Sequence, residues 1–274
     1  QGAGMPDMAQ AWKAAVPEPG ALPENALSLD PEKLLELQRQ YLDGAKAMCE
    51  QGGAQALLAK DKRFNTQSWA DNPLTAATAA TYLLNSRMLM GLAEAVQAWG
   101  GADDLWVFGY ASLIWRPEFD AVEHRPALVR GWHRAFQMRS RINRGTPEQP
   151  GLVYALVSGG MCRGMVYRIP RERGREELER LWLREMPTGV YDPRWLTCHT
   201  PQGPVRALAF TLSRKSPNHT GELPDHEYRR IFDEACGRYG TTRDYAQATY
   251  DELRRHGIHD RALARLIALA QKEA

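Results

Sequence analysis

The segment Val107–Trp115, VFGYASLIW, puts backbone hydrogen-bond donors at the end of an apolar strand. Leu105–Phe108 is apolar and aromatic, which predicts a buried strand, and Gly109 lets the chain turn after it. Backbone N–H groups exposed in such a turn can bind an anion. The loop Tyr110–Leu113 is therefore a candidate binding element, and a strand that ends in a plain tight turn is the alternative.

A second group that can do chemistry is the carboxylate of Glu185. It lies at the end of an expected helix and just before the break at Pro187–Gly189. Its neighbours in the sequence are mostly apolar: Leu181, Trp182, Leu183 and Met186. Partial desolvation raises the pKa of a carboxyl toward the range in which it can act as a general base and acid near neutral pH. The alternative is an exposed glutamate paired with Arg180 or Arg184.

The elements that must position these groups are short strands followed by helices. The expected strands are Leu105–Phe108, Ala127–Met138, Leu152–Val157, Met165–Ile169, Trp195–Thr200 and Val205–Leu212. Helices are expected at about 171–184 and from Asp225 onward. This order predicts an α+β fold with a small closed or half-closed sheet and excludes a doubly wound parallel sheet.

The first 100 residues predict a separate α-helical region. One helix begins at Asp30–Pro31 and a second at Asn72–Pro73, each a capping residue followed by proline. Apolar residues at helical spacing continue both helices, and Gly100–Gly101 ends the second. We therefore expect a helical region over residues 1–100 and a sheet-containing domain over 101–274.

The composition, with 43% hydrophobic and 25% charged residues in a chain of 274, is typical of a soluble globular protein. No apolar run reaches the roughly 18 residues of a membrane span, and the N-terminus has no signal-peptide pattern, so we expect a cytoplasmic location. The net charge of +2, with its basic excess in residues 101–274, suits an anionic metabolite as well as it suits nucleic acid. We expect no nucleic acid partner, no disulfide and no metal, because the motifs for these are missing.

Several separated motifs resemble the γ-glutamylcyclotransferases of the ChaC family. VFGYASLIW is similar to the family signature FGYGSLIW, with Ala111 in place of the usual glycine, and Leu181–Tyr191, LWLREMPTGVY, resembles the catalytic segment. The segments GWHRAF, Gly131–Phe136, and RGTPEQPG, Arg144–Gly151, recur in bacterial members. The resemblance covers about residues 104–270 and implies a small mixed β-barrel with surrounding helices.

The resemblance implies a reaction in which a γ-glutamyl amide is cleaved by its own α-amino group. A five-membered lactam closes and the amine leaves, so no cofactor is required. Glu185 aligns with the catalytic carboxylate, which takes a proton from the α-amine and returns one to the leaving nitrogen. The loop N–H groups are then expected to bind the α-carboxylate of the substrate.

The expected substrate-binding residues are Tyr110, Ala111, Ser112, Leu113, Arg144 and Tyr191. Arg144 is the candidate for a second carboxylate contact, with a solvated surface position as the alternative. Tyr191 is expected to line the pocket, with core packing as the alternative. If the family glycine is needed because the backbone has a positive φ there, Ala111 is strained. If the glycine is needed only because other atoms approach the backbone closely, the methyl group of Ala111 is tolerated.

Residues 61–96 resemble the N-terminal helical region of polyhydroxyalkanoate synthases, including the central Trp69 and the Tyr82–Arg87 run. This resemblance implies self-association or a polyhydroxyalkanoate-related partner, with simple packing on the following domain as the alternative. Those synthases carry a cysteine in a GxCxG elbow, which Gly160–Gly164 matches in letters. An elbow needs a strand before it and a helix after it, whereas here Cys162 is expected in a β-hairpin and so is not a nucleophile.

The combined expectation is a lyase, a glutathione-specific γ-glutamylcyclotransferase that yields 5-oxoproline and Cys-Gly with Glu185 as base and acid. Glutathione follows from the family, since the residues themselves indicate only a γ-glutamyl group. One alternative is a cyclotransferase for other γ-glutamyl amines. The other is a weak or inactive interaction module, impaired by Ala111 and recruited to polyhydroxyalkanoate granules or synthase.

Overall fold

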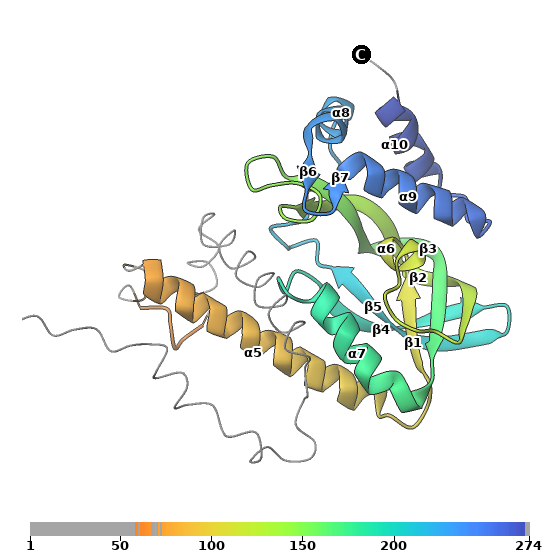
Figure 1. The fold of residues 1–274 in the computed structure, drawn as a ribbon, viewed down its shortest axis with the longest axis horizontal. Coiled ribbons are helices and arrows are strands. Elements are labelled where there is room, and N and C mark those ends of the chain that lie inside the picture. Colours follow the sequence, from red (N-terminus) through yellow and green to blue (C-terminus); the bar gives the residue numbers. More distant parts are fainter. Residues whose placement is uncertain (1–57, 60, 67–68, 70, 72, 272–274) are drawn as a thin grey trace, which may run out of the picture. The chain divides into compact units, whose positions relative to one another are not determined.

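The computed structural model describes residues 58–59, 61–66, 69, 71 and 73–271, all within the unit Arg39–Ala274. The first expected helix, from Asp30, lies outside the described residues. The second is present as α5, Pro73–Trp99 (Figure 1). Gly100 and Gly101 end it with φ values of +81° and +72°, a backbone conformation that glycine adopts without steric cost.

Five strands close into a barrel with the order β1-β3-β2-β4-β5 (Figure 1). They are β1 Leu105–Gly109, β2 Glu123–Ser140, β3 Gly151–Ile169, β4 Asp192–Thr200 and β5 Gly203–Leu212. Most neighbours are antiparallel, and β5 closes the barrel through parallel pairing with β1 and β3. The predicted α+β fold with a small mixed barrel is confirmed.

Strand β3 differs from the prediction at Ser158–Gly160. The sequence predicts two strands joined by a turn, but β3 runs through this point and pairs with β2 on both sides of it. Gly159 and Gly160 have φ values of +102° and +71°, and the register with β2 shifts beside Gly131. The glycines therefore form a bulge and not a turn. The expected hairpin around Cys162 is wrong, and this cysteine lies within one long strand.

Helices cover the barrel at several places. Their bounds are α6 Ser112–Trp115, α7 Arg171–Glu185, α8 Asp225–Glu234, α9 Thr242–Arg255 and α10 Arg261–Gln271. Helix α7 contacts α5, and α8, α9 and α10 contact one another in the blue part of Figure 1. The short helix α6 stands where the sequence predicts only a loop. Leu178, Leu181 and Trp182 on α7 are buried at helical spacing, which binds this helix to the core.

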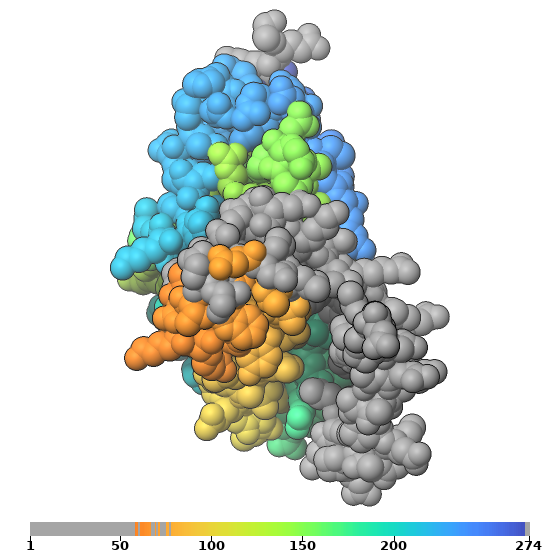
Figure 2. Space-filling model, turned by 90° about the vertical axis from the view of Figure 1, so that its left-hand side faces the viewer, coloured from red at the N-terminus to blue at the C-terminus, as the bar shows by residue number. Residues whose placement is uncertain are grey.

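Helix α5 also packs on the barrel domain. The indole Nε1 of Trp182 donates to the Met88 carbonyl at 2.9 Å, and Leu92 and Val96 pack against the main core. Other positions, such as Met90, are exposed, and α5 is visible at the surface as the orange to yellow segment in Figure 2. Within the described residues, none of the helices has the length and hydrophobicity of a membrane-spanning segment.

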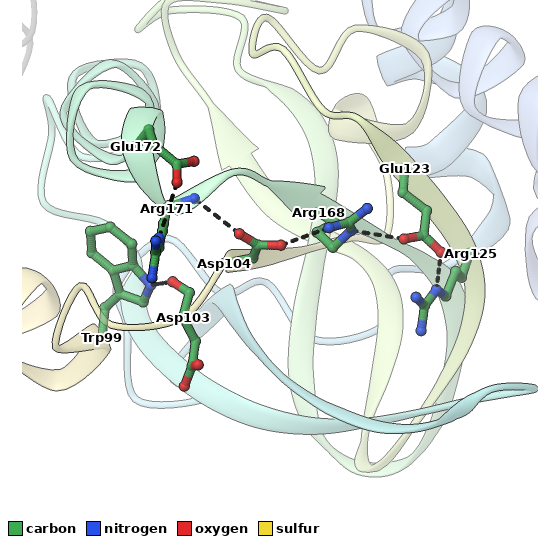
Figure 3. Close-up of polar contacts among 8 residues, drawn as sticks. All are labelled: Trp99, Asp103, Asp104, Glu123, Arg125, Arg168, Arg171 and Glu172. Carbon is green, nitrogen blue, oxygen red and sulfur yellow. Dashed lines mark hydrogen bonds and ion pairs between the residues drawn. The ribbon is translucent and has the colours of Figure 1, made fainter.

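A chain of polar contacts fixes the start of β1 against β2, β3 and α7 (Figure 3). Asp104 pairs with Arg168 at 2.7 Å and accepts from the backbone N–H of Arg171 at 3.0 Å. Arg168 also donates to Glu123 at 2.8 Å, and the indole of Trp99 donates to the Asp103 carbonyl at 3.0 Å. Partly exposed pairs of this kind stabilise little individually. Together these contacts hold the first residues of β1 in place. They therefore help to position the loop Tyr110–Leu113, which follows the other end of the strand.

Candidate active site

A pocket lies at the end of β1. It is lined by Tyr110, Ala111, Ser112, Leu113, Tyr154, Glu185, Tyr191, Phe210 and Tyr245. These residues come from β3, β5, α6, α7, α9 and the segments before α6 and β4. Six of the seven predicted site residues thus meet in one pocket, although they are far apart in the sequence.

Glu185 is the last residue of α7 and the only carboxylate in the pocket lining. Its side chain is 11% exposed. Burial raises the pKa of this carboxyl, the Arg184 charge opposes that rise, and the Glu118 charge adds to it. A carboxylate in such an environment can accept and return a proton closer to neutral pH than an exposed one.

Arg184 ties the end of α7 to the segment that follows α6. Its Nε lies 3.1 Å from Glu185 Oε1, and an Nη1 contact of 3.2 Å joins it to Glu118. The same guanidinium donates to the carbonyls of Arg116 and Pro117. The predicted alternative of an arginine pair at Glu185 is therefore present, but the side chain is largely buried and not exposed.

The turn after β1 approaches its neighbours closely. A Cβ at Gly109 would lie 3.1 Å from the Tyr167 ring and 3.2 Å from Leu113 Cβ, so glycine suits the space. Ser112 and Leu113 open the single turn of α6, and the first N–H groups of a helix have no carbonyl partner within it. Ala111 has a φ of −147°, outside the region that favours glycine. Its methyl group therefore imposes no positive-φ strain.

Four tyrosines form most of the remaining wall. The Tyr110 hydroxyl donates to the Phe210 carbonyl at 2.9 Å, and the Tyr245 hydroxyl accepts from the Tyr154 backbone N–H at 3.2 Å. Burial is the main cause that raises the pKa of all four phenols, Tyr191 included, so they are neutral at physiological pH. Sequence reasoning missed Tyr154, Phe210 and Tyr245, because in strands β3 and β5 and helix α9 an aromatic residue indicates only core packing.

Arg144 does not line the pocket. Its Nη1 donates to the backbone carbonyls of Tyr239 and Thr241, and its guanidinium lies 5.2 Å from the ring centre of Tyr245. The residue is 8% exposed, and burial lowers the pKa of its guanidinium. Arg144 thus supports Tyr245, which does line the pocket, and the predicted carboxylate contact stays a prediction.

Arg134 is the arginine of the GWHRAF segment. Its side chain is 3% exposed and pairs with Asp260 at 2.6 Å, between α9 and α10. It also donates to the carbonyls of Tyr110 and Arg163. The buried guanidinium therefore joins the pocket loop to the C-terminal helices, which the sequence alone did not indicate.

The cysteines of the described region show no catalytic arrangement. Cys162 is 2% exposed, and burial raises the pKa of its thiol, which disfavours the nucleophilic thiolate. Cys162, Cys198 and Cys236 are free thiols. No group of three or more potential metal ligands occurs among the described residues.

A family model described as ChaC-like protein matches residues 105–273. The chain belongs to the ChaC-like family. The match spans the barrel and the helices after it, including every residue in the pocket lining. The recognition of the ChaC family from the sequence motifs is confirmed.

Two curated relatives show how far the similarity extends. The glutathione-specific γ-glutamylcyclotransferase of Escherichia coli (strain K12) is 36% identical over 169 residues, which are 61% of this chain and 73% of that protein. Glutathione-specific γ-glutamylcyclotransferase 1 of Mus musculus is 34% identical over 139 residues, 48% of this chain and 62% of that protein. The chain thus spans less than two thirds of the mouse protein.

A solved structure supports the fold. The crystal structure of a γ-glutamyl cyclotransferase specific to glutathione from yeast matches with a TM-score of 0.56 and 21% identity, over 61% of this chain and 96% of that one. At this identity the likeness concerns the barrel architecture. The resemblance of residues 61–96 to polyhydroxyalkanoate synthases is not shown by these matches.

Proposed function

We propose that this ChaC-like protein is a γ-glutamylcyclotransferase that cleaves glutathione into 5-oxoproline and Cys-Gly. The observation that carries the proposal is the buried carboxylate of Glu185, which lines one pocket together with the first residues of α6. The names of the Escherichia coli and mouse relatives support glutathione as the substrate. The family match over residues 105–273 supports the reaction type.

The reaction needs a base for the α-amine and an acid for the leaving nitrogen. Glu185 takes a proton as the α-amine nitrogen bonds to the γ-carbonyl carbon. The bond from that carbon to the cysteinyl nitrogen then breaks, and Glu185 returns the proton to this nitrogen. Burial raises the pKa of the carboxyl and so suits it to both steps. Proton transfer of this kind contributes about 10²- to 10⁴-fold in rate.

The orientation of the substrate comes from the α6 segment. The N–H groups that open α6 are donors for the α-carboxylate, which would place the adjacent α-amine toward Glu185 in the same pocket. Holding the amine near the carbonyl carbon reduces the entropic cost of ring closure. The four tyrosines form most of the remaining wall and, because they are neutral, they add no charge to the pocket.

Incubation of the purified protein with glutathione tests the proposal. We expect 5-oxoproline and Cys-Gly in equal amounts, and no release from glutathione whose α-amine is acetylated, because the nucleophile is then blocked. A panel of other γ-glutamyl amines separates a glutathione-specific enzyme from a general one. Intact glutathione after incubation with folded protein would refute the function.

We further propose that residues 1–100 mediate self-association or contact with a polyhydroxyalkanoate-related partner, and that the enzyme acts in the cytoplasm. Exposed apolar side chains on α5, such as Leu89 and Met90, support an association surface. Light scattering on the full chain and on a Leu89→Gln, Met90→Gln variant tests self-association. Identical monomers in both samples would contradict it.

A further inference from the structure

The hydroxyl group of Tyr154 has no hydrogen-bond partner among the protein groups of the described residues. Tyr154 is 3% exposed, and buried polar groups in folded proteins almost always have a partner. The residue also lines the pocket that contains Glu185. An unpaired donor at the wall of a binding pocket indicates a group that is paired by the ligand.

Packing holds the Tyr154 ring in place. Its ring centre lies 4.7 Å from that of Phe136 and 5.8 Å from that of Tyr245. Its backbone N–H donates to the Tyr245 hydroxyl at 3.2 Å, and the residue lies within the long strand β3. The hydroxyl is therefore presented by a rigid element, as preorganised stabilisation of a transition state requires.

The charge state of Tyr154 makes it a donor. Burial raises the pKa of its phenol well above the ordinary value, and the Tyr245 phenol adds to this effect. The hydroxyl therefore keeps its proton at neutral pH. A neutral donor in a buried pocket matches a substrate oxygen that carries partial or developing negative charge.

The γ-glutamyl unit has three polar groups: the α-carboxylate, the α-amine and the γ-carbonyl. The opening N–H groups of α6 suit the carboxylate, and Glu185 suits the amine. We propose that the Tyr154 hydroxyl donates a hydrogen bond to the γ-carbonyl oxygen and stabilises the oxyanion that forms on it. This inference rests on the proposed function and adds a second catalytic residue to it.

The step balances without an added reactant. As the α-amine nitrogen bonds to the γ-carbon, the carbonyl π electrons move to oxygen, where the Tyr154 hydrogen bond stabilises them. The electrons return when the bond to the cysteinyl nitrogen breaks, and Glu185 delivers the amine proton to that nitrogen. Tyr154 keeps its own proton throughout.

The Tyr154→Phe variant removes only the hydroxyl. We expect kcat for 5-oxoproline release from glutathione to fall about 10²-fold, the usual effect of losing one oxyanion donor, with KM changed by less than about threefold. The thermal midpoint should equal or exceed that of the wild type, because no bond within the protein is lost. This combination separates catalysis from structure.

Tyr228→Phe is the matched control. Tyr228 is buried, lies 6.5 Å ring to ring from the same Phe136, and does not line the pocket. Its hydroxyl accepts from the Leu223 N–H at 3.3 Å, so this variant should lose stability and keep kcat.

Four outcomes decide the matter. An unchanged kcat in Tyr154→Phe, a rise in KM alone, or a lowered thermal midpoint would each overturn the Tyr154 role and leave the proposed function standing. A wild-type protein that releases no 5-oxoproline would overturn both.

Discussion

Replacing Glu185 with glutamine removes the proton acceptor and keeps the size and shape of the side chain. The α-amine then loses its base and the leaving nitrogen its acid, so the rate should fall by about 10²- to 10⁴-fold. Substrate binding should change little, because the α6 N–H groups are untouched. The loss is therefore expected in kcat with KM nearly unchanged.

The same substitution should not destabilise the fold. Burial raises the pKa of the Glu185 carboxyl above its ordinary value of 4.5, which means that the fold disfavours the ionised form. Each pKa unit of such a rise corresponds to about 1.4 kcal/mol. Arg184 loses Glu185 as an ionic partner but keeps Glu118 at 3.2 Å and the carbonyls of Arg116 and Pro117.

The sign of the pH effect follows from the direction of that shift. The pKa of this carboxyl is higher in the folded protein than its ordinary value of 4.5. Its contribution to the free energy of unfolding is therefore fully present below pH 4.5 and is lost as the pH rises through the folded-state pKa. Above the folded-state pKa the wild type lacks this contribution, and the neutral glutamine avoids the penalty of an ionised group. The variant should be as stable as the wild type or more stable.

The assay combines 5-oxoproline release at saturating glutathione with thermal unfolding of the same samples. Glu176→Gln is the control, because Glu176 lies on the same helix, is exposed and pairs with Arg180 at 2.9 Å. This control should keep wild-type activity. Glu185→Gln protein with more than about a tenth of the wild-type kcat would refute the assignment of Glu185 as base and acid.

Three further predictions concern the surroundings of the pocket. Glu118→Gln removes a charge that raises the pKa of Glu185, so the acid limb of the kcat/KM profile should move to lower pH; a shift to higher pH would contradict the electrostatic account. Ala111→Gly should leave the 5-oxoproline rate unchanged or higher, since φ is already negative, and a large loss would refute the account of the loop. Asp260→Ala leaves the buried Arg134 charge without its 2.6 Å partner and should lower the free energy of unfolding in urea by about 3 kcal/mol; a loss below about 1 kcal/mol would show that the carbonyl partners suffice.

Local patterns predicted most of the elements. The apolar run at Leu105–Phe108 predicted β1, and Gly100–Gly101 marked the end of α5, because both depend on neighbouring residues alone. The same reasoning failed at Ser158–Gly160, where a glycine pair indicates a turn. There the pairing with β2 continues past the glycines. Because this long-range pairing holds the strand together, the two glycines form a bulge and not a turn.

The sequence by itself determined the family, the barrel class and the identity of Glu185 as the candidate carboxylate, since these rest on motifs and on periodicity along the chain. Only the tertiary structure decided which aromatic residues face the pocket. Tyr154 and Tyr228 are both buried tyrosines. The Tyr228 hydroxyl accepts from a backbone N–H, whereas the Tyr154 hydroxyl has no protein partner in the described region. The partner of Tyr228 is local, because Leu223 lies five residues away in the chain. The position of Tyr154 in the pocket depends on the tertiary fold, which brings residues of β3, α7 and α9 together from distant parts of the chain.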